Sequence, residues 1–211
     1  MSQQHSDAAP HPARAAPGGR PRDKTIDDRA TQAVLTLLGR GPYTALTMEA
    51  IAVTAGTSKP ALRRRWNSLP GVVVHALISV LGTTPTLDTG CVRCDLLAGI
   101  SNLADGLTSS SVANALPGLV SDFAGDSELK AFFFREYFEP RRNSTRAALE
   151  RAIARGEIYK TIDMELTPDL LAAPLYYRAL FGHQPIDAGL AERIVLSVLG
   201  GIASPDGNRL H

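Results

Sequence analysis

Residues 46–66 constrain the fold most, because they have the pattern of two short helices joined by a tight turn. Thr47 and Ser58 are residue types that cap helix N-termini, and Gly56 between them can adopt the positive φ that ends a helix. Pro60 would lie in the first turn of the second helix, where its missing N–H group is not needed. The stretch therefore predicts a helix-turn-helix.

The second of these helices is expected to be short, basic and exposed. Leu62 and Trp66 are four residues apart and can point inward together. The cationic side chains are then left outside or at the edges, and they are Lys59, Arg63, Arg64 and Arg65. The same spacing also fits an ordinary helical hairpin with a charged face. Three consecutive arginines after a capped start favour DNA binding, because phosphate attraction requires an exposed basic helix.

The charge distribution supports two functional parts. The chain of 211 residues has a net charge of only +1. Residues 1–75 contain ten Lys or Arg and five Asp or Glu, whereas residues 76–211 contain twelve and sixteen. A basic front and an acidic back indicate a DNA-facing part followed by a part with another role.

Membrane, secreted and metal-binding classes find little support in the sequence. No apolar run is long enough to span a bilayer, and the N-terminus lacks the apolar segment of a secretory signal. We therefore expect a soluble cytoplasmic protein with no membrane partner. Cys91 and Cys94 form an isolated C-x-x-C, which fits a redox pair, half a metal site, or two small residues at a helix start. We adopt the last interpretation and expect no metal and no cofactor.

The remaining apolar spacing is helical, which predicts an all-α protein. Residues 1–21 are rich in Ala, Pro, Gly, Gln and His and are interpreted as a disordered basic arm. Residues 22–67 would form a three-helix DNA-binding domain, and residues 68–211 a helical regulatory and dimerisation domain. The helices expected outside the helix-turn-helix cover about 25–39, 68–81, 93–107, 114–124, 127–156, 167–181 and 187–202. Pro140 and Pro174 should bend their helices without ending them.

The chain resembles the tetracycline-repressor (TetR) family of bacterial transcriptional regulators. In the helix-turn-helix the resemblance is carried by Leu46-Thr47, Ile51-Ala52, Ala55-Gly56, Ser58-Lys59, Leu62 and Arg64-Arg65-Trp66. In the C-terminal half it is carried by Asp88-Thr89-Gly90, Glu139-Pro140-Arg141-Arg142, Ala154-Arg155-Gly156-Glu157 and Pro174-Leu175-Tyr176-Tyr177-Arg178. The resemblance implies a repressor that binds a palindromic operator as a homodimer and is released by a small hydrophobic effector.

The resemblance also implies a set of residues that contact double-stranded DNA. Hydroxyls of two helix caps would meet phosphates, and the start of the recognition helix would face base edges in the major groove. The set is Thr47, Ser58, Lys59, Pro60, Ala61, Arg63, Arg64 and Arg65. Two positions depart from the family pattern. Arg63 stands where a phosphate-contacting tyrosine is usual and can replace it, whereas Leu69 stands where a lysine is common and cannot.

Two further sites are expected in the regulatory domain. The apolar inner faces of its helices would line an effector pocket through Ile100, Leu103, Leu107, Leu116, Phe133, Tyr137 and Tyr177. The same faces suit a plain packed core. The last two helices would form a dimer interface, as a two-fold four-helix bundle, through Leu175, Tyr176, Leu190, Ile194, Val198 and Ile202.

Two other functions compete with an effector-controlled regulator. An enzyme would need a paired nucleophile and base or a carboxylate pair. Glu136 and Glu139 could form such a pair, but Arg135, Arg141 and Arg142 surround them, which favours a solvated face. The second alternative, a DNA-binding regulator controlled by a partner protein, is not separated from the first by the sequence.

Overall fold

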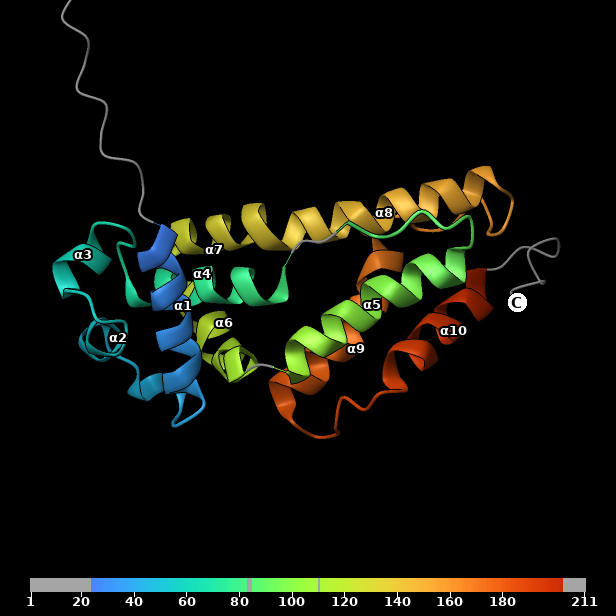
Figure 1. Ribbon diagram of the computed structural model, residues 1–211. Helices are drawn as coiled ribbons and strands as arrows, with labels where there is room; N and C mark the ends of the chain where they lie inside the picture. Colours follow the sequence, from blue (N-terminus) through green and yellow to red (C-terminus); the bar gives the residue numbers. More distant parts are fainter. Residues whose placement is uncertain (1–23, 83–84, 110, 203–211) are drawn as a thin grey trace, which may run out of the picture.

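The computed structural model describes residues 24–82, 85–109 and 111–202, and these residues form helices and no β-strand (Figure 1). The predicted all-α fold is therefore confirmed for this part of the chain. The expected basic arm, residues 1–21, lies outside the described residues.

The N-terminal unit contains the predicted helix-turn-helix and the helices that support it. Its elements are α1 (Lys24–Leu38), the 3-10 helix η1 (Tyr43–Ala45), α2 (Met48–Thr54), α3 (Lys59–Arg63) and α4 (Leu69–Leu81). Helix α1 packs against both α2 and α4. Val34, Ile51 and Leu62 are fully buried among these helices, and Trp66 is nearly so. The inward positions of Leu62 and Trp66 agree with the sequence prediction.

The regulatory half is built around α5, which packs against α4, α8, α9 and α10. The elements of this half are α5 (Val92–Thr108), the 3-10 helix η2 (Ser111–Ala115), α6 (Leu116–Gly125), α7 (Ser127–Phe133), the π-helical turn η3 (Phe134–Phe138), α8 (Glu139–Ala154), α9 (Leu166–Phe181) and α10 (Leu190–Ile202). The molecule is elongated, with α2 and α3 at one end and the last turns of α8 and α10 at the other (Figure 1).

The helix expected over residues 127–156 continues past Pro140 as predicted, but it contains a wider turn. In η3 the N–H group of Glu139 donates to the carbonyl of Phe134, five residues back. Proline lacks an N–H group, and the π turn immediately before Pro140 accommodates this interruption of the α-helical pattern. The helix begins at Ser127, and the preceding Asp126 caps it, because its carboxylate accepts the N–H of Leu129 at 2.8 Å.

Other helix ends follow from local chemistry. Pro174 lies inside α9, and Gly182 ends that helix in the left-handed region with φ of 60°. Cys91 is the N-cap of α5, where its sulfur accepts the N–H of Cys94 at 3.2 Å. This is the helix-start position that the sequence suggested. No helix in residues 24–82, 85–109 or 111–202 is both long and apolar enough to cross a bilayer.

Candidate nucleic-acid interface and ligand cavity

The two short helices at the end of the molecule have the predicted caps. Thr47 Oγ1 accepts the N–H of Ala50 at 3.0 Å, and Ser58 Oγ accepts the N–H of Ala61 at 3.3 Å. Gly56 has a φ of 59°, which lies in the left-handed region that glycine adopts without strain. These local contacts fix the start of α3 relative to α2.

Helix α3 presents cations that the protein does not neutralise. Pro60, Arg63 and Arg64 are exposed. Within the described residues no carboxylate lies within ion-pair distance of Arg63 or Arg64. Lys59 differs, because its Nζ lies 3.0 Å from Glu49 Oε2 on α2. The exposed end of α3 therefore carries free positive charge beside one weak, solvent-accessible ion pair.

Two of the predicted DNA-contacting residues are placed differently from the expectation. Ala61 is only 7% exposed, because the helix turns positions 61 and 62 toward the core, so its methyl group is not available to a base. Arg65 is held by Asp27 of α1, with Nε 2.9 Å from Oδ1 and both side chains only 15% exposed. Arg65 therefore ties the end of α3 to α1. This role could not be predicted from the sequence, because Asp27 is far from Arg65 along the chain.

A cavity of about 710 Å³ lies in the regulatory half. Helices α5, α6, α7, α8 and α9, the turn η3 and residues 85–87 line it, mainly with apolar side chains. Five of the predicted lining residues border it, and these are Ile100, Leu103, Leu116, Phe133 and Tyr177. Leu107 and Tyr137 do not border it, because both are packed inside the protein core.

The cavity also has lining residues that periodicity did not identify. They include Phe123, Phe138, Arg141, Arg142, Tyr176 and Leu180. Tyr176 and Tyr137 share a hydrogen bond of 2.9 Å between their hydroxyls. Burial raises the pKa of both phenols, so both groups are neutral at physiological pH. Tyr176 directly precedes Tyr177 in the sequence, and only the orientation of α9 decides which of the two is buried.

The two arginines of the cavity have different partners. Arg142 donates to Asp169 and to Glu165, with Nη2 2.9 Å from Glu165 Oε2. The hydrogen bond that Arg142 donates to the Glu165 carboxylate raises the pKa of Arg142. Arg141 instead donates to backbone carbonyls at the end of α4 and to the side chain of Asn102, 3.1 Å away.

A direct contact joins α6, which lines the cavity, to η1, which precedes the helix-turn-helix. The Tyr43 hydroxyl of η1 donates to the carboxylate of Asp122 on α6. The Tyr43 ring lies over Gly118, where a Cβ would come within 2.6 Å of Tyr43 Cε1. Glycine at 118 is thus required for this close approach. Because α6 also lines the cavity through Leu116 and Leu119, the wall of the cavity and the segment before α2 are mechanically connected.

The residues expected at the dimer interface pack largely within their own protomer. Leu175, Leu190 and Ile194 are 0%, 4% and 6% exposed within a single protomer, because they pack against the core of their own chain. Tyr176 faces the cavity, and Val198 and Ile202 are half-buried. The exposed large apolar side chains of α9 and α10 are Leu166, Leu170, Tyr177, Phe181 and Leu196. The apolar surface is therefore on these two helices, as predicted, but on a different face.

The helix-turn-helix, its unpaired arginines and the attached helical domain define a DNA-binding transcriptional regulator. A family model described as "Tetracyclin repressor-like, C-terminal domain" matches residues 86–198. The chain belongs to this TetR family of regulators.

Named relatives cover most of the chain. It is 28% identical over 185 residues to the uncharacterized HTH-type transcriptional regulator YdeS of Bacillus subtilis, covering 87% of this chain and 93% of that protein. It is also 28% identical over 180 residues to the DNA-binding transcriptional repressor TetR of Mycobacteroides abscessus, covering 84% and 94%. The solved structure of the TetR family transcription regulator SCO0332 superposes with a TM-score of 0.65 at 27% identity, covering 85% and 99%. These relatives are named as regulators, not as enzymes.

Proposed function

We propose that the protein is a transcriptional repressor that binds a palindromic operator as a homodimer and is released by a small hydrophobic effector. The observation that carries the effector part is the apolar cavity of about 710 Å³. This volume is in the range of small-molecule sites. The same cavity is bordered by α6, which contacts Tyr43 ahead of the helix-turn-helix.

We assign contacts with base edges and contacts with phosphates to different side chains of α2, α3 and their caps. Lys59 and Pro60 at the start of α3 would meet base edges, with the Lys59 ammonium as the donor to guanine. The Thr47 and Ser58 hydroxyls and the exposed guanidinium groups of Arg63 and Arg64 would meet phosphates. Ala61 and Arg65 are left out of this assignment because one is buried and the other is paired.

The homodimer would use the exposed apolar stripe on α9 together with Leu196 of α10. Leu166, Leu170, Tyr177 and Phe181 recur at intervals of four, seven and four residues, which places them along one side of α9. A second copy of the same stripe, related by a two-fold axis, would cover it as a four-helix bundle. Two copies of α3 would then face two half-sites of one palindrome.

Release follows if the effector prefers a conformation in which the two α3 helices no longer match the half-sites. An effector shifts this equilibrium only by its difference in affinity between the two conformations. Displacement of α6 by a molecule in the cavity would be passed to η1 through the contact of Tyr43 with Gly118 and Asp122.

The proposal is tested in two stages. A random duplex library is first selected on the full-length protein, and enrichment of a palindrome is expected. A library of small apolar molecules is then screened for compounds that both raise the melting temperature and weaken binding to the selected duplex. If the palindrome is obtained but no compound does both, the effector part is wrong and control by a partner protein replaces it.

A further inference from the structure

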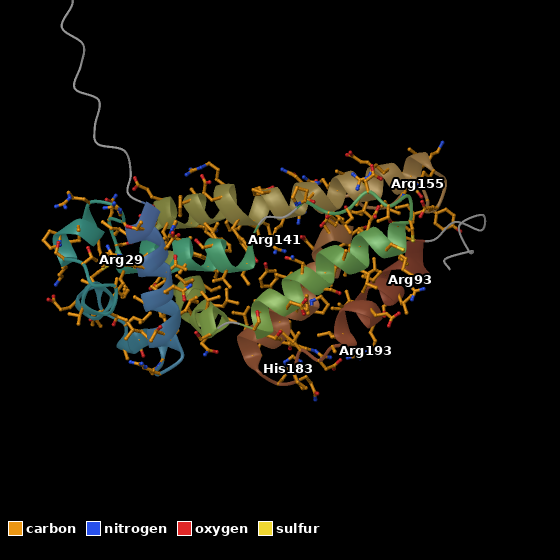
Figure 2. All side chains as sticks on the ribbon, in the orientation of Figure 1. Arg29, Arg93, Arg141, Arg155, His183 and Arg193 are labelled. Carbon is orange, nitrogen blue, oxygen red and sulfur yellow. The ribbon has the colours of Figure 1, made fainter. Side chains whose placement is uncertain are left out.

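Arg141 lies in the middle of the molecule beneath α8, close to the point where α4 ends (Figure 2). Its Nε donates to the carbonyl of Gly82 at 3.0 Å, and its Nη2 donates to the carbonyl of Leu81 and to Asn102 Oδ1. Nη1 has no acceptor in the described part of the chain and is not among the buried, unsatisfied atoms. Arg141 is also one of the residues that line the cavity, so a residue of the cavity wall has donor capacity left.

No carboxylate of the described residues pairs with Arg141, whose guanidinium lies over the Tyr137 ring with Cζ 5.3 Å from the ring centroid. Among the described arginines of the regulatory half it is the one without a carboxylate within 4.0 Å, whereas Arg142 next to it has two. A cation beside an apolar cavity is stabilised when an anion enters with it. The guanidinium fork fits the two oxygens of a carboxylate. Because Arg142 is already neutralised by Asp169 and Glu165, the cavity can match one negative charge and not two.

The same guanidinium stabilises the end of the helix that leads from the DNA-binding unit. The last carbonyls of a helix lack intrahelical partners and lie at the negative end of its dipole, so a cation there is stabilising. Arg141 supplies that cation to Leu81 and Gly82 of α4. At its other end α4 begins at Leu69, three residues after Trp66 of the helix-turn-helix. The α4 terminus also sits tightly on α5, where a Cβ on Gly106 would come within 2.6 Å of Leu81 Cδ2.

We propose that the effector is an apolar molecule carrying a single carboxylate, and that Arg141 receives this carboxylate in competition with the C-terminus of α4. Each N–H group that turns toward the ligand is withdrawn from the carbonyls of Leu81 and Gly82. Effector binding thereby loosens the link between α8 and α4. This inference rests on the proposed effector cavity and specifies both its ligand class and the residue that couples it to α4.

Matched probe pairs test the ligand class on the full-length protein. Decanoate, dodecanoate and naphthoate are each compared with the corresponding primary amide, which has nearly the same shape and no charge. Calorimetric titration should show at least one carboxylate binding about tenfold to a hundredfold more tightly than its amide, as expected for a charge-assisted hydrogen bond. The preferred carboxylate, and not its amide, should weaken binding to the selected duplex.

Variants assign the preference to Arg141. Arg141→Gln should bring the carboxylate-to-amide ratio close to one, and Arg141→Lys, which keeps the cation, should retain part of it. Arg146→Gln is the matched control on the same helix, because Arg146 is paired with Glu165 and does not border the cavity, and it should keep the full ratio. If Arg141→Gln does not fold, the carboxylate-to-amide affinity ratios of the wild-type protein and of Arg141→Lys still test the assignment.

The outcomes separate this inference from the proposed function. If an amide binds as tightly as its carboxylate and releases the duplex equally well, the cavity is an effector site but the carboxylate assignment is wrong. If Arg141→Gln keeps the wild-type ratio, the carboxylate is received elsewhere and the inference is overturned. If no probe of either kind binds, while the wider screen finds an effector without a carboxylate, the ligand class alone is rejected. If that screen also fails, the effector site itself is rejected.

Discussion

The arginines of α3 and those of the regulatory half differ in whether a carboxylate of the chain pairs with them. On α3 the guanidinium groups of Arg63 and Arg64 are exposed and have no carboxylate within ion-pair distance in the described residues. In the regulatory half, the described arginines other than Arg141 each have such a partner, as Arg142 has in Asp169 and Glu165. The comparison separates arginines whose charge is neutralised within the chain from unpaired arginines, whose charge is left available to anions from outside it.

Arg65 and Arg141 make this contrast clearer, because the ion pairing of each differs from that of the arginine beside it in the sequence. Arg65 follows two free arginines and yet joins α3 to α1 through Asp27. Arg141 precedes a paired arginine and yet binds only neutral acceptors. Ion pairing, and not position in the sequence, is therefore the criterion by which we separate structural arginines from those that we propose to bind an external anion.

The largest expected effect on operator affinity comes from dissociating the proposed dimer, which separates its two copies of α3. Leu170→Arg introduces a charge into the exposed stripe of α9 and should convert the dimer to a monomer in sedimentation velocity. Affinity for the palindrome should fall by about a hundredfold or more, because the two half-sites are then bound independently. Glu150→Arg, an exposed position on α8, is the control and should remain dimeric. A Leu170→Arg protein that stays dimeric would remove α9 from the interface.

Removal of a free arginine should weaken binding to every duplex. Arg63→Ala is expected to lower affinity for operator and scrambled sequences alike, because binding to a phosphate carries no sequence information. The slope of log affinity against log salt should fall by roughly one for each phosphate that the variant no longer binds, and a dimer has two copies of Arg63. Titrations at several salt concentrations measure both quantities. An unchanged slope on the scrambled duplex would show that Arg63 does not bind a phosphate.

Lys59 should behave differently from the arginines, because it lies at the start of α3. Lys59→Ala should cost about 1–3 kcal/mol at the operator and relax the preference at one base pair in each half-site. Glu49→Gln is the companion variant, since it removes the carboxylate 3.0 Å from Lys59 Nζ and should raise affinity for both duplexes. Equal reductions on operator and scrambled duplex in Lys59→Ala would reject base reading by this residue.

The smallest effect concerns Arg142 and Arg146 of α8, which pair with carboxylates at the start of α9. The hydrogen bond from Arg142 is the main cause that lowers the pKa of Glu165. A carboxylate with a lowered folded-state pKa contributes stability that is present above its ordinary pKa and is lost as the pH falls through the folded value. Glu165→Gln should therefore lower the melting temperature slightly at neutral pH and leave it nearly unchanged once the pH is below the lowered folded-state pKa of Glu165. An equal decrease at both pH values would exclude charge pairing as its role.

The helix-turn-helix could be predicted from the sequence because its determinants are local. Thr47, Gly56 and Ser58 act on residues within four positions of themselves, so the caps and the turn were correct. The structure differs from the expectation where a distant residue intervenes. Asp27 pairs with Arg65, and the packing of α3 on the core buries Ala61.

The cavity and the dimer face were less predictable because both depend on how helices far apart in the sequence are rotated. Periodicity identified apolar faces, and five of seven expected lining residues border the cavity. It could not show that α9 turns Leu175 inward and Leu170 outward, since both are leucines on one helix. Nor could it show that Arg141 reaches the end of α4, where its partners are 59 and 60 positions away in the sequence.

The most direct test of the contrast between free and paired arginines compares two adjacent residues. Arg64→Ala and Arg65→Ala make the same chemical change, and each is titrated with the selected duplex over a range of salt concentrations. Arg64→Ala should lower the salt slope by roughly one per protomer and leave the melting temperature unchanged. Arg65→Ala should leave the slope unchanged and lower the melting temperature, because the ion pair between Arg65 and Asp27 is then lost. A lowered slope in Arg65→Ala, or an unchanged one in Arg64→Ala, would contradict the account.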